Sequence, residues 1–250
     1  MKKIEIVNLH KTLGDKYVLR GIDLDIEQGK TLAIIGQSGS GKSVLIKHLV
    51  GLIKPDKGKI FVDGTEITGL DEENLRLIRK KFGMLFQGGA LFDSLTVGQN
   101  VSFGLENYTD LSPTEIQKKT KESLIKVGLR DIEELMPHEL SGGMKKRVAL
   151  ARAIAYDPEI ILYDEPSTGI DPIRADAIND LINMMRDDMG MTSVVITHDL
   201  VSSYKVADRM AMLYEGKIIE TGTPDEIKNT ENHVLQQFLN GSAEGPLKNW

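Results

Sequence analysis

The sequence predicts an α/β protein built on a parallel sheet, with antiparallel strands near its N-terminus and an inserted α-helical subdomain. Short apolar runs alternate with helical patterns, which is typical of a parallel sheet covered by helices. One apolar run passes into a glycine-rich loop and then into a helical stretch, the opening of a βαβ unit. Residues 96–156 carry helix signals but few strand signals. The 250 residues are enough to bury a large core, and we expect a single domain over residues 1–250.

The first third of the chain shows strand patterns around one helix. Residues 22–27 alternate between apolar and acidic side chains, the period of a half-buried strand. Residues 31–35 are almost continuously apolar, as expected of a buried strand, and the helical stretch after the glycine-rich loop covers 43–50. Two more short runs predict strands at 59–62 and 83–86.

Two helices are predicted in the middle of the chain. Ser112-Pro113-Thr114-Glu115 is a capping box with proline at the first helical position, and Gly128 is suited to end the helix that the box begins. A second helix is expected to begin near Ser141 and to end before Asp157-Pro158. These helices predict an inserted helical subdomain within residues 96–156.

The last part of the chain predicts a return to the sheet. Apolar runs at 160–163 and 193–196 indicate two strands, and a helical pattern over 172–188 separates them. Residues 210–220 are typical of a hairpin that turns at Glu-Gly, and a last helix is expected from the capping box at 223–226.

The composition excludes several classes of protein. With 31 Lys and Arg against 37 Asp and Glu, the net charge of −6 gives no basic footprint, so we expect no nucleic-acid partner. The absence of cysteine excludes a disulfide scaffold, a thiolate metal site and a cysteine nucleophile. No apolar run approaches the roughly 20 residues that span a bilayer, and the first residues do not form a signal peptide. We therefore expect a cytoplasmic protein.

The glycine-rich loop is a full match to the phosphate-binding pattern G-x-x-x-x-G-K-[ST]. Its glycines let backbone N–H groups converge on a phosphate, and the following helix adds its positive end. Lys42 supplies a charge for β- and γ-phosphates, and the Ser43 hydroxyl is placed to bind Mg²⁺. The alternative is a glycine-rich turn that only caps a helix, which the position between a buried strand and a helix disfavours. The loop predicts a P-loop NTPase core, and its expected nucleotide-binding residues are Gly36, Ser38, Gly39, Ser40, Gly41, Lys42 and Ser43.

Two acids, Asp164 and Glu165, follow the predicted strand at 160–163. The carboxyl ends of parallel strands are where an open α/β sheet binds its ligands. Asp164 can act as a second anchor for Mg²⁺, and Glu165 can act as general base toward the water that attacks the γ-phosphate. Taken alone, such acids are as often helix caps. The upstream loop favours the catalytic interpretation.

The segment Leu140-Ser141-Gly142-Gly143-Met144 resembles the LSGGQ signature of ABC ATPases. Alone it could be a capped helix start, but other landmarks of that family occur in the same order. Gln87 follows a predicted strand, as the family's Q-loop glutamine does, and residues 167–171 stand where the D-loop stands. His198 follows the strand at 193–196, as the H-loop histidine does. The resemblance covers residues 1–230.

The resemblance implies that two cassettes stack head to tail as a homodimer with ATP between them. Ser141, Gly142 and Gly143 of one cassette would then reach the γ-phosphate of an ATP held by the other. His198 would hold the γ-phosphate and Glu165, Gln87 would sense water and Mg²⁺, and Asp171 would bridge the two copies. The family pattern also implies the division of the domain into a RecA-like catalytic core with its antiparallel strands (1–86 and 157–230), a helical signature subdomain (87–156), and a C-terminal helix and tail (231–250).

The chain departs from the family pattern at two places. Leu13 occupies the place of the aromatic residue that commonly stacks on adenine, and nearby Tyr17 is a candidate replacement; the alternative is an ordinary strand tyrosine. The signature ends in Met144 where glutamine is usual. The basic run at 145–147, which follows the signature, is interpreted mostly as a solvated helix face.

Three stretches are similar to the MlaF-type ATPases of MCE lipid-transport systems: residues 86–92, the signature ending in Met144, and residues 238–246. This resemblance implies a phospholipid transporter, a separate permease of the MlaE type, an MCE-type lipid carrier, and a peripheral position on the inner face of the cell membrane. Two alternatives stay open: an importer ATPase for another solute, and an ABC ATPase of iron–sulfur assembly.

Two segments outside the motifs suggest contacts with partners. Residues 91–103 are rich in apolar side chains and are expected to dock a permease helix, unless Leu95, Val97, Val101 and Phe103 belong to the core. The polar tail from Gly241 to Trp250 is a candidate contact with the neighbouring cassette.

Overall fold

The computed structural model describes residues 1–247, so the predicted contact of Trp250 lies outside the described part of the chain. The chain forms two compact units. The first comprises residues 1–75 and those from 194 onward, and the second comprises residues 76–193. Among residues 1–247, no helix has both the length and the apolar character that crossing a membrane requires.

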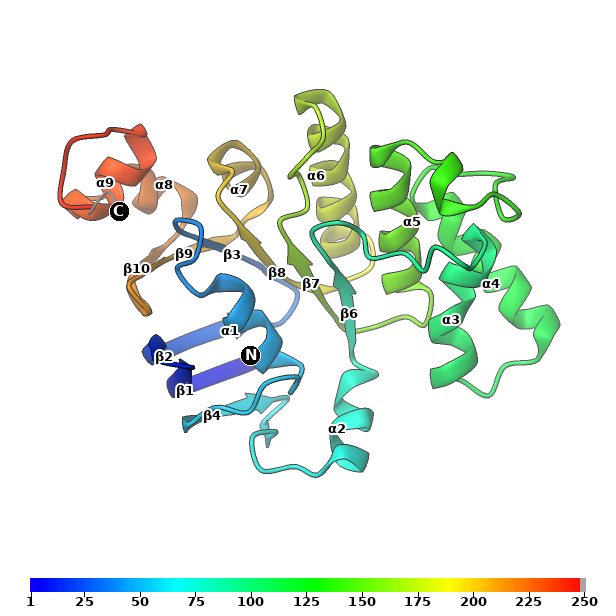
Figure 1. Cartoon of the computed structure of the whole chain (residues 1–250), viewed down its shortest axis with the longest axis horizontal. Helices are drawn as coiled ribbons and strands as arrows, with labels where there is room; N and C mark the ends of the chain where they lie inside the picture. The colour runs from blue at the N-terminus through cyan, green and yellow to red at the C-terminus, as the bar shows by residue number, and fades with distance from the viewer. Residues whose placement is uncertain (248–250) are drawn as a thin grey trace. The chain divides into compact units, whose positions relative to one another are not determined.

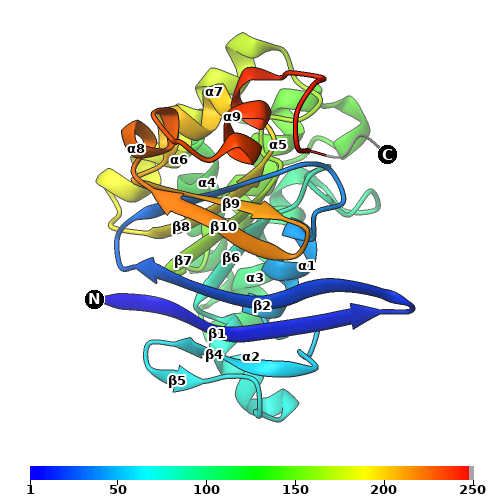
Figure 2. The same cartoon turned by 90° about the vertical axis from the view of Figure 1, so that its left-hand side faces the viewer.

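The first unit contains an antiparallel sheet with the strand order β2-β1-β4-β5 (Figure 2). Ile4 pairs with Ile26 and Ile6 with Leu24, and all four side chains are buried. The alternation predicted at residues 22–27 is confirmed, since the acidic residues there are exposed. The bounds of these strands are Lys2–Leu13 (β1), Lys16–Glu27 (β2), Lys57–Val62 (β4) and Thr65–Glu66 (β5).

A second group of strands in the same unit leads into the glycine-rich loop. β3 (Thr31–Ile35) is buried along its whole length and runs parallel to β9 (Arg209–Tyr214). β9 pairs antiparallel with β10 (Lys217–Gly222), which confirms the predicted hairpin. Helix α1 (Lys42–Leu49) follows the loop, as the βαβ pattern predicts.

The C-terminal helices pack on a core cluster that includes Ile35 of β3 and Met212 of β9. The tail then folds back on its own helix rather than extending from it: the buried Gln237 side chain accepts from the Leu247 N–H at 2.6 Å and donates to the Ser242 carbonyl at 3.1 Å. Figure 1 shows this segment at the red end of the chain. The helices are α7 (Leu200–Val206), α8 (Pro224–Lys228) and α9 (His233–Asn240).

The second unit combines two parallel strands, β6 and β7, with a group of helices in which α3, α4 and α5 pack on one another (green in Figure 1). The capping box at Ser112 begins α4 and Gly128 follows its end with a φ of 75°, as the sequence predicts. The elements are β6 (Phe82–Leu85), α3 (Val97–Tyr108), α4 (Pro113–Lys126), a 3₁₀ turn (Pro137–Glu139), α5 (Gly142–Ile154), β7 (Ile160–Asp164) and α6 (Pro172–Asp187). The unit boundaries fall within α2 (Glu72–Arg79) and β8 (Thr192–Thr197).

Candidate functional site

The glycine-rich loop between β3 and α1 has a backbone that its glycines make possible. Gly36 has a φ of 153°, and a Cβ there would lie 2.3 Å from the carbonyl oxygen of Leu213. Gly41 has a φ of 108° and a Cβ there would lie 3.0 Å from Val18. The Lys42 ammonium, only 6 % exposed, donates to the carbonyls of Gly36 at 2.8 Å and Gln37 at 3.0 Å, so it also holds the loop in its curl.

This loop fits a phosphate group. The hydroxyl oxygen of Ser40 is buried and has no hydrogen-bond partner within residues 1–247, and an orphaned buried hydroxyl is costly unless a ligand uses it. Helix α1 begins at Lys42, has no acidic residue in its first turn, and exposes Ser43 there. An anion at this helix end therefore meets a positive dipole, a lysine and hydroxyl groups.

Tyr17 and the loop line one cavity of about 270 Å³, together with Arg20 and the β9–β10 turn. The Tyr17 hydroxyl is hydrogen-bonded to Nδ1 of His10, and the Arg20 guanidinium lies 5.6 Å from the centre of the Tyr17 ring. Leu13 is not among the residues that line this cavity. The structure thus brings Tyr17, and not Leu13, together with the phosphate-binding loop.

His198 lies in the same unit, directly after β8, and is exposed. The turn that carries it is fixed on both sides. The N–H of Asp199 donates to the Thr197 hydroxyl at 3.0 Å, and the Asp199 side chain caps helix α7 by accepting from the N–H of Ser202 at 3.2 Å.

In the second unit, Asp164 and Glu165 lie at the end of β7 and each is 9 % exposed. Glu165 has a φ of 51°, a left-handed conformation that residues with a Cβ seldom adopt. Thr168 stabilises this turn twice, by donating its N–H to the Glu165 carbonyl at 3.2 Å and its hydroxyl to the Glu165 carboxylate at 3.1 Å. No cluster of three or more His, Asp and Glu suited to a metal occurs within residues 1–247. Mg²⁺ is usually bound through one or two protein side chains together with substrate phosphates and water, and it does not require such a cluster.

Lys146 on helix α5 corrects the sequence analysis. The interpretation of residues 145–147 as a solvated face is wrong for Lys146, which is only 6 % exposed. Its ammonium donates to the carbonyls of Pro166 at 2.6 Å and Glu165 at 3.3 Å. Burial lowers the pKa of Lys146, while the Glu165 carboxylate acts in the opposite direction. A helical stripe of alanine and valine gives no signal of which lysine faces inward.

The signature segment begins helix α5 as predicted. The Ser141 hydroxyl accepts the N–H of Met144 at 3.3 Å, and Ser141 and Gly142 are exposed. A Cβ on Gly143 would lie 3.2 Å from the Arg174 side chain, and Arg174 also forms an ion pair with Asp171 at 3.3 Å. Asp171 caps α6 by accepting from the N–H of Arg174, a structural role that the sequence did not indicate.

Gln87 follows β6 and is exposed, in a turn closed by the N–H of Gly89 donating to the Phe86 carbonyl at 2.8 Å. Arg152, also on α5, donates to the carbonyls of Gly89 and Ala90, each at 2.7 Å. Sequence reasoning missed Arg152, because its partners lie more than 60 residues away in the chain and no local pattern marks them.

The segment of residues 91–103 divides between the two interpretations that the sequence left open. Val97 and Val101 are buried in the helical core. Phe92 and Phe103 are 42 % and 43 % exposed, with ring centres 4.8 Å apart. We call these two side chains the aromatic pair. The segment is held by the fully buried Asn100, whose amide accepts from the N–H of Phe92 and donates to carbonyls of the preceding turn.

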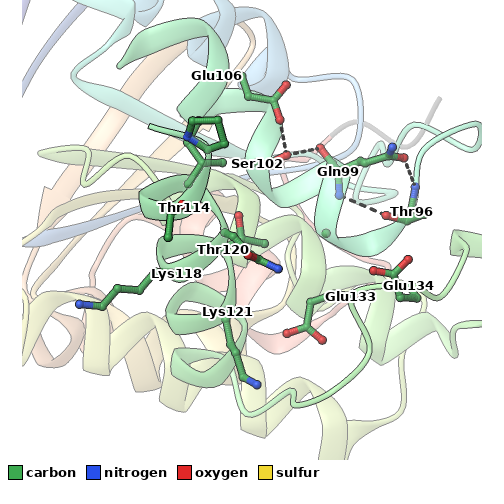
Figure 3. A pocket seen from close by; sticks show the side chains of 14 residues that line it. Thr96, Gln99, Ser102, Glu106, Thr114, Lys118, Thr120, Lys121, Glu133 and Glu134 are labelled. Carbon is green, nitrogen blue, oxygen red and sulfur yellow. Dashed lines mark hydrogen bonds between the residues drawn. The ribbon is translucent and has the colours of Figure 1, made fainter. Parts of the chain in front are cut away.

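A larger cavity of about 890 Å³ lies between α3 and α4 (Figure 3). Its wall carries charges of both signs, with Lys118 and Lys121 on α4 and with Glu106, Glu133 and Glu134. None of the residues predicted to carry chemistry lines this cavity. It also lacks a glycine-rich loop, so its chemistry gives no reason to place a nucleotide there.

The chain is similar to a protein family and to several known proteins. The model of the family described as ABC transporter matches residues 19–168. The chloroplastic protein TRIGALACTOSYLDIACYLGLYCEROL 3 of Arabidopsis thaliana is 40 % identical, covering 98 % of this chain and 75 % of that protein. The intermembrane phospholipid transport system ATP-binding protein MlaF of Haemophilus influenzae is also 40 % identical, covering 98 % and 93 %. The dimeric ATP-binding cassette MJ0796, solved in a post-hydrolysis state with ADP and Pi, is 32 % identical with a TM-score of 0.82, covering 88 % and 98 %.

Proposed function

The chain belongs to the ABC transporter ATPases, among those of MlaF type, and we propose that it is the ATP-hydrolysing subunit of a phospholipid transporter that drives a separate membrane permease. The loop of residues 36–43 carries this proposal. Three features of the loop together suit the phosphates of ATP: the positive φ angles of its glycines, the Lys42 ammonium bound to its carbonyls, and the buried Ser40 hydroxyl, which has no hydrogen-bond partner within residues 1–247.

The nucleotide is assigned to the loop of residues 36–43 and to Tyr17. Lys42 binds the β- and γ-phosphates, and the remaining loop residues contribute backbone N–H groups and hydroxyls. Tyr17 stacks on the base, which its place in the loop cavity supports. Ser43, Asp164 and Gln87 are the proposed ligands of Mg²⁺, which would neutralise phosphate charge.

Hydrolysis is assigned to Glu165 as the general base that accepts a proton from the attacking water. His198 holds the γ-phosphate, and Gln87 orients the water and metal. The exposed positions of His198 and Gln87 at strand ends support these roles, since both side chains are accessible to a ligand.

The working form is a homodimer with two ATP between the copies. Ser141, Gly142 and Gly143 of one copy contact the γ-phosphate held by the other, and Asp171 bridges the copies. The exposed helix start at Ser141 supports this, because a capped N-terminus with two glycines admits an anion. The dimeric form of the MJ0796 cassette supports it as well.

The names of the relatives support the proposed partners and the proposed place in the cell. The name of the MlaF relative speaks of intermembrane phospholipid transport, so we assign this chain a permease of the MlaE type and an MCE-type lipid carrier. The protein then lies in the cytoplasm, peripheral on the inner face of the cell membrane. The aromatic pair is its docking surface for the permease, because exposed aromatic side chains in contact favour a protein partner.

The variant Glu165→Gln tests the general base and the dimer together. Its mass by light scattering, with and without ATP and Mg²⁺, is expected to double on addition of ATP while hydrolysis falls at least about 100-fold. The exposed Glu231→Gln is the matched control and is expected to hydrolyse ATP at the unmodified rate. Full hydrolysis by Glu165→Gln would overturn the general base, and a monomer with ATP bound would overturn the ATP-driven dimer.

A further inference from the structure

Lys146 is a buried ammonium group that none of the motifs explains. It lies on α5 two residues beyond the end of the signature segment and is only 6 % exposed. Burying a charge without compensation is strongly unfavourable, so its partners indicate what it does. Those partners are two consecutive carbonyls, Glu165 at 3.3 Å and Pro166 at 2.6 Å.

These carbonyls belong to the strained turn that presents the proposed general base. Glu165 has a φ of 51°, and a non-glycine residue keeps such a conformation only where its surroundings hold it there. An ammonium group has three donors and no acceptor, so it can bind two carbonyls that turn toward it at once. Lys146 is therefore placed to stabilise the left-handed backbone at Glu165.

The carboxylate of Glu165 has a separate support. Thr168 donates its hydroxyl to Oε2 at 3.1 Å and its N–H to the Glu165 carbonyl at 3.2 Å. The backbone of Glu165 is thus bound by Lys146 of α5, and its carboxylate is bound by Thr168 in the segment that follows β7. Neither support is visible in the order of the family motifs.

We propose that Lys146 is a positioning residue for hydrolysis: from the signature helix it fixes the left-handed turn at Glu165 and thereby aims the carboxylate, with Thr168 holding the carboxylate oxygen. This rests on the proposed role of Glu165 as general base. One helix then carries two functions, because the segment that reaches the partner's ATP and the lysine that aims the base move as a single rigid element.

Steady-state hydrolysis by Lys146→Met tests the proposal. Methionine keeps most of the length of the side chain and removes the charge and the donors. We expect kcat to fall about 10- to 100-fold while KM for ATP changes less than about threefold. The reason is that the orientation of the Glu165 carboxylate affects the transition state of hydrolysis but not the binding of ATP. Lys145→Met, one residue away and partly exposed, is the matched control with kcat within about twofold of the unmodified protein. A Lys146→Met variant with unchanged kcat would overturn the proposal.

A double variant separates positioning from a general effect on the fold. In the Glu165→Gln background there is no base to aim, so adding Lys146→Met is expected to lower the residual single-turnover rate less than about twofold. A further loss as large as that of Lys146→Met alone would show that the lysine acts elsewhere, and would overturn the proposal. Full activity of Glu165→Gln itself would instead overturn the proposed general base, so the two failures are distinguishable.

Lys146→Met is folded only if it shows a cooperative unfolding transition on heating. If it shows none, two further variants test the proposal. Lys146→Gln retains a neutral donor and needs no buried charge, and Thr168→Val removes only the bond to the carboxylate. Each is expected to lower kcat about three- to tenfold at unchanged KM. Unchanged kcat in Lys146→Gln, measured on folded protein, would overturn the proposal.

Discussion

The loop of residues 36–43 and the turn at Glu165 both follow a strand whose residues are all buried, β3 in one unit and β7 in the other. Both turns contain residues with positive φ. In the loop these residues are glycines, whereas in the turn the residue is a charged glutamate. The loop adopts its shape because its own residues allow it. The turn adopts its shape because Lys146 and Thr168 hold it.

This difference separates two ways of building a phosphate site. A loop that only has to surround an anion can use backbone N–H groups, so glycine is sufficient. A turn that must present a carboxylate cannot use glycine, and the conformational cost of the side chain has to be offset by other residues. Local sequence therefore encodes the loop, whereas the turn also depends on Lys146, which lies 19 residues away in the chain.

The largest effect is expected from Gly36→Ala in the loop. Its Cβ would lie 2.3 Å from the Leu213 carbonyl oxygen, a backbone atom that cannot rotate away. We expect the free energy of unfolding, measured in urea, to fall by about 3 kcal/mol or more. Gly39→Ala is the control. It shares a positive φ but meets nothing within 4 Å among the described residues, so about 1 kcal/mol is expected. Equal losses in the two variants would refute the steric explanation.

A smaller effect on the free energy of unfolding is expected when glycine, the residue that the loop uses at positive φ, replaces Glu165 in the turn. Glu165→Gly and Glu165→Ala both remove the carboxylate, but only glycine is at ease at a φ of 51°. The glycine variant is expected to exceed the alanine variant in free energy of unfolding by about 1 kcal/mol, and both are expected to lose hydrolysis. Urea unfolding of the two proteins measures the difference. If the alanine variant were the more stable, the turn would not be strained.

The sequence predicts the loop in full, and the elements around it, because each signal is local. The match to the phosphate-binding pattern, the buried strand before it and the helix after it lie within about 20 consecutive residues. Positions that depend on packing between distant segments are different. Lys145 and Lys146 are indistinguishable in a basic run, yet only Lys146 meets the carbonyls of the turn. Arg152 likewise binds carbonyls that local periodicity cannot associate with it.

The smallest effect is expected from two hydroxyls, one in each region. In the loop, Ser40 Oγ is buried without a partner in residues 1–247, whereas in the turn the Thr168 hydroxyl binds the Glu165 carboxylate. Thr168→Val is therefore expected to lower the free energy of unfolding by about 1 kcal/mol, and Ser40→Ala to change it by less than about 0.5 kcal/mol. With ATP bound, the order of the two effects on stability is expected to reverse, because the Ser40 hydroxyl is the one that would bind a phosphate. Ser40→Ala should therefore lose more of the stabilisation by ATP than Thr168→Val does. Thermal unfolding of both variants with and without ATP and Mg²⁺ measures this, and an equal shift by ATP in the two would contradict the role given to Ser40.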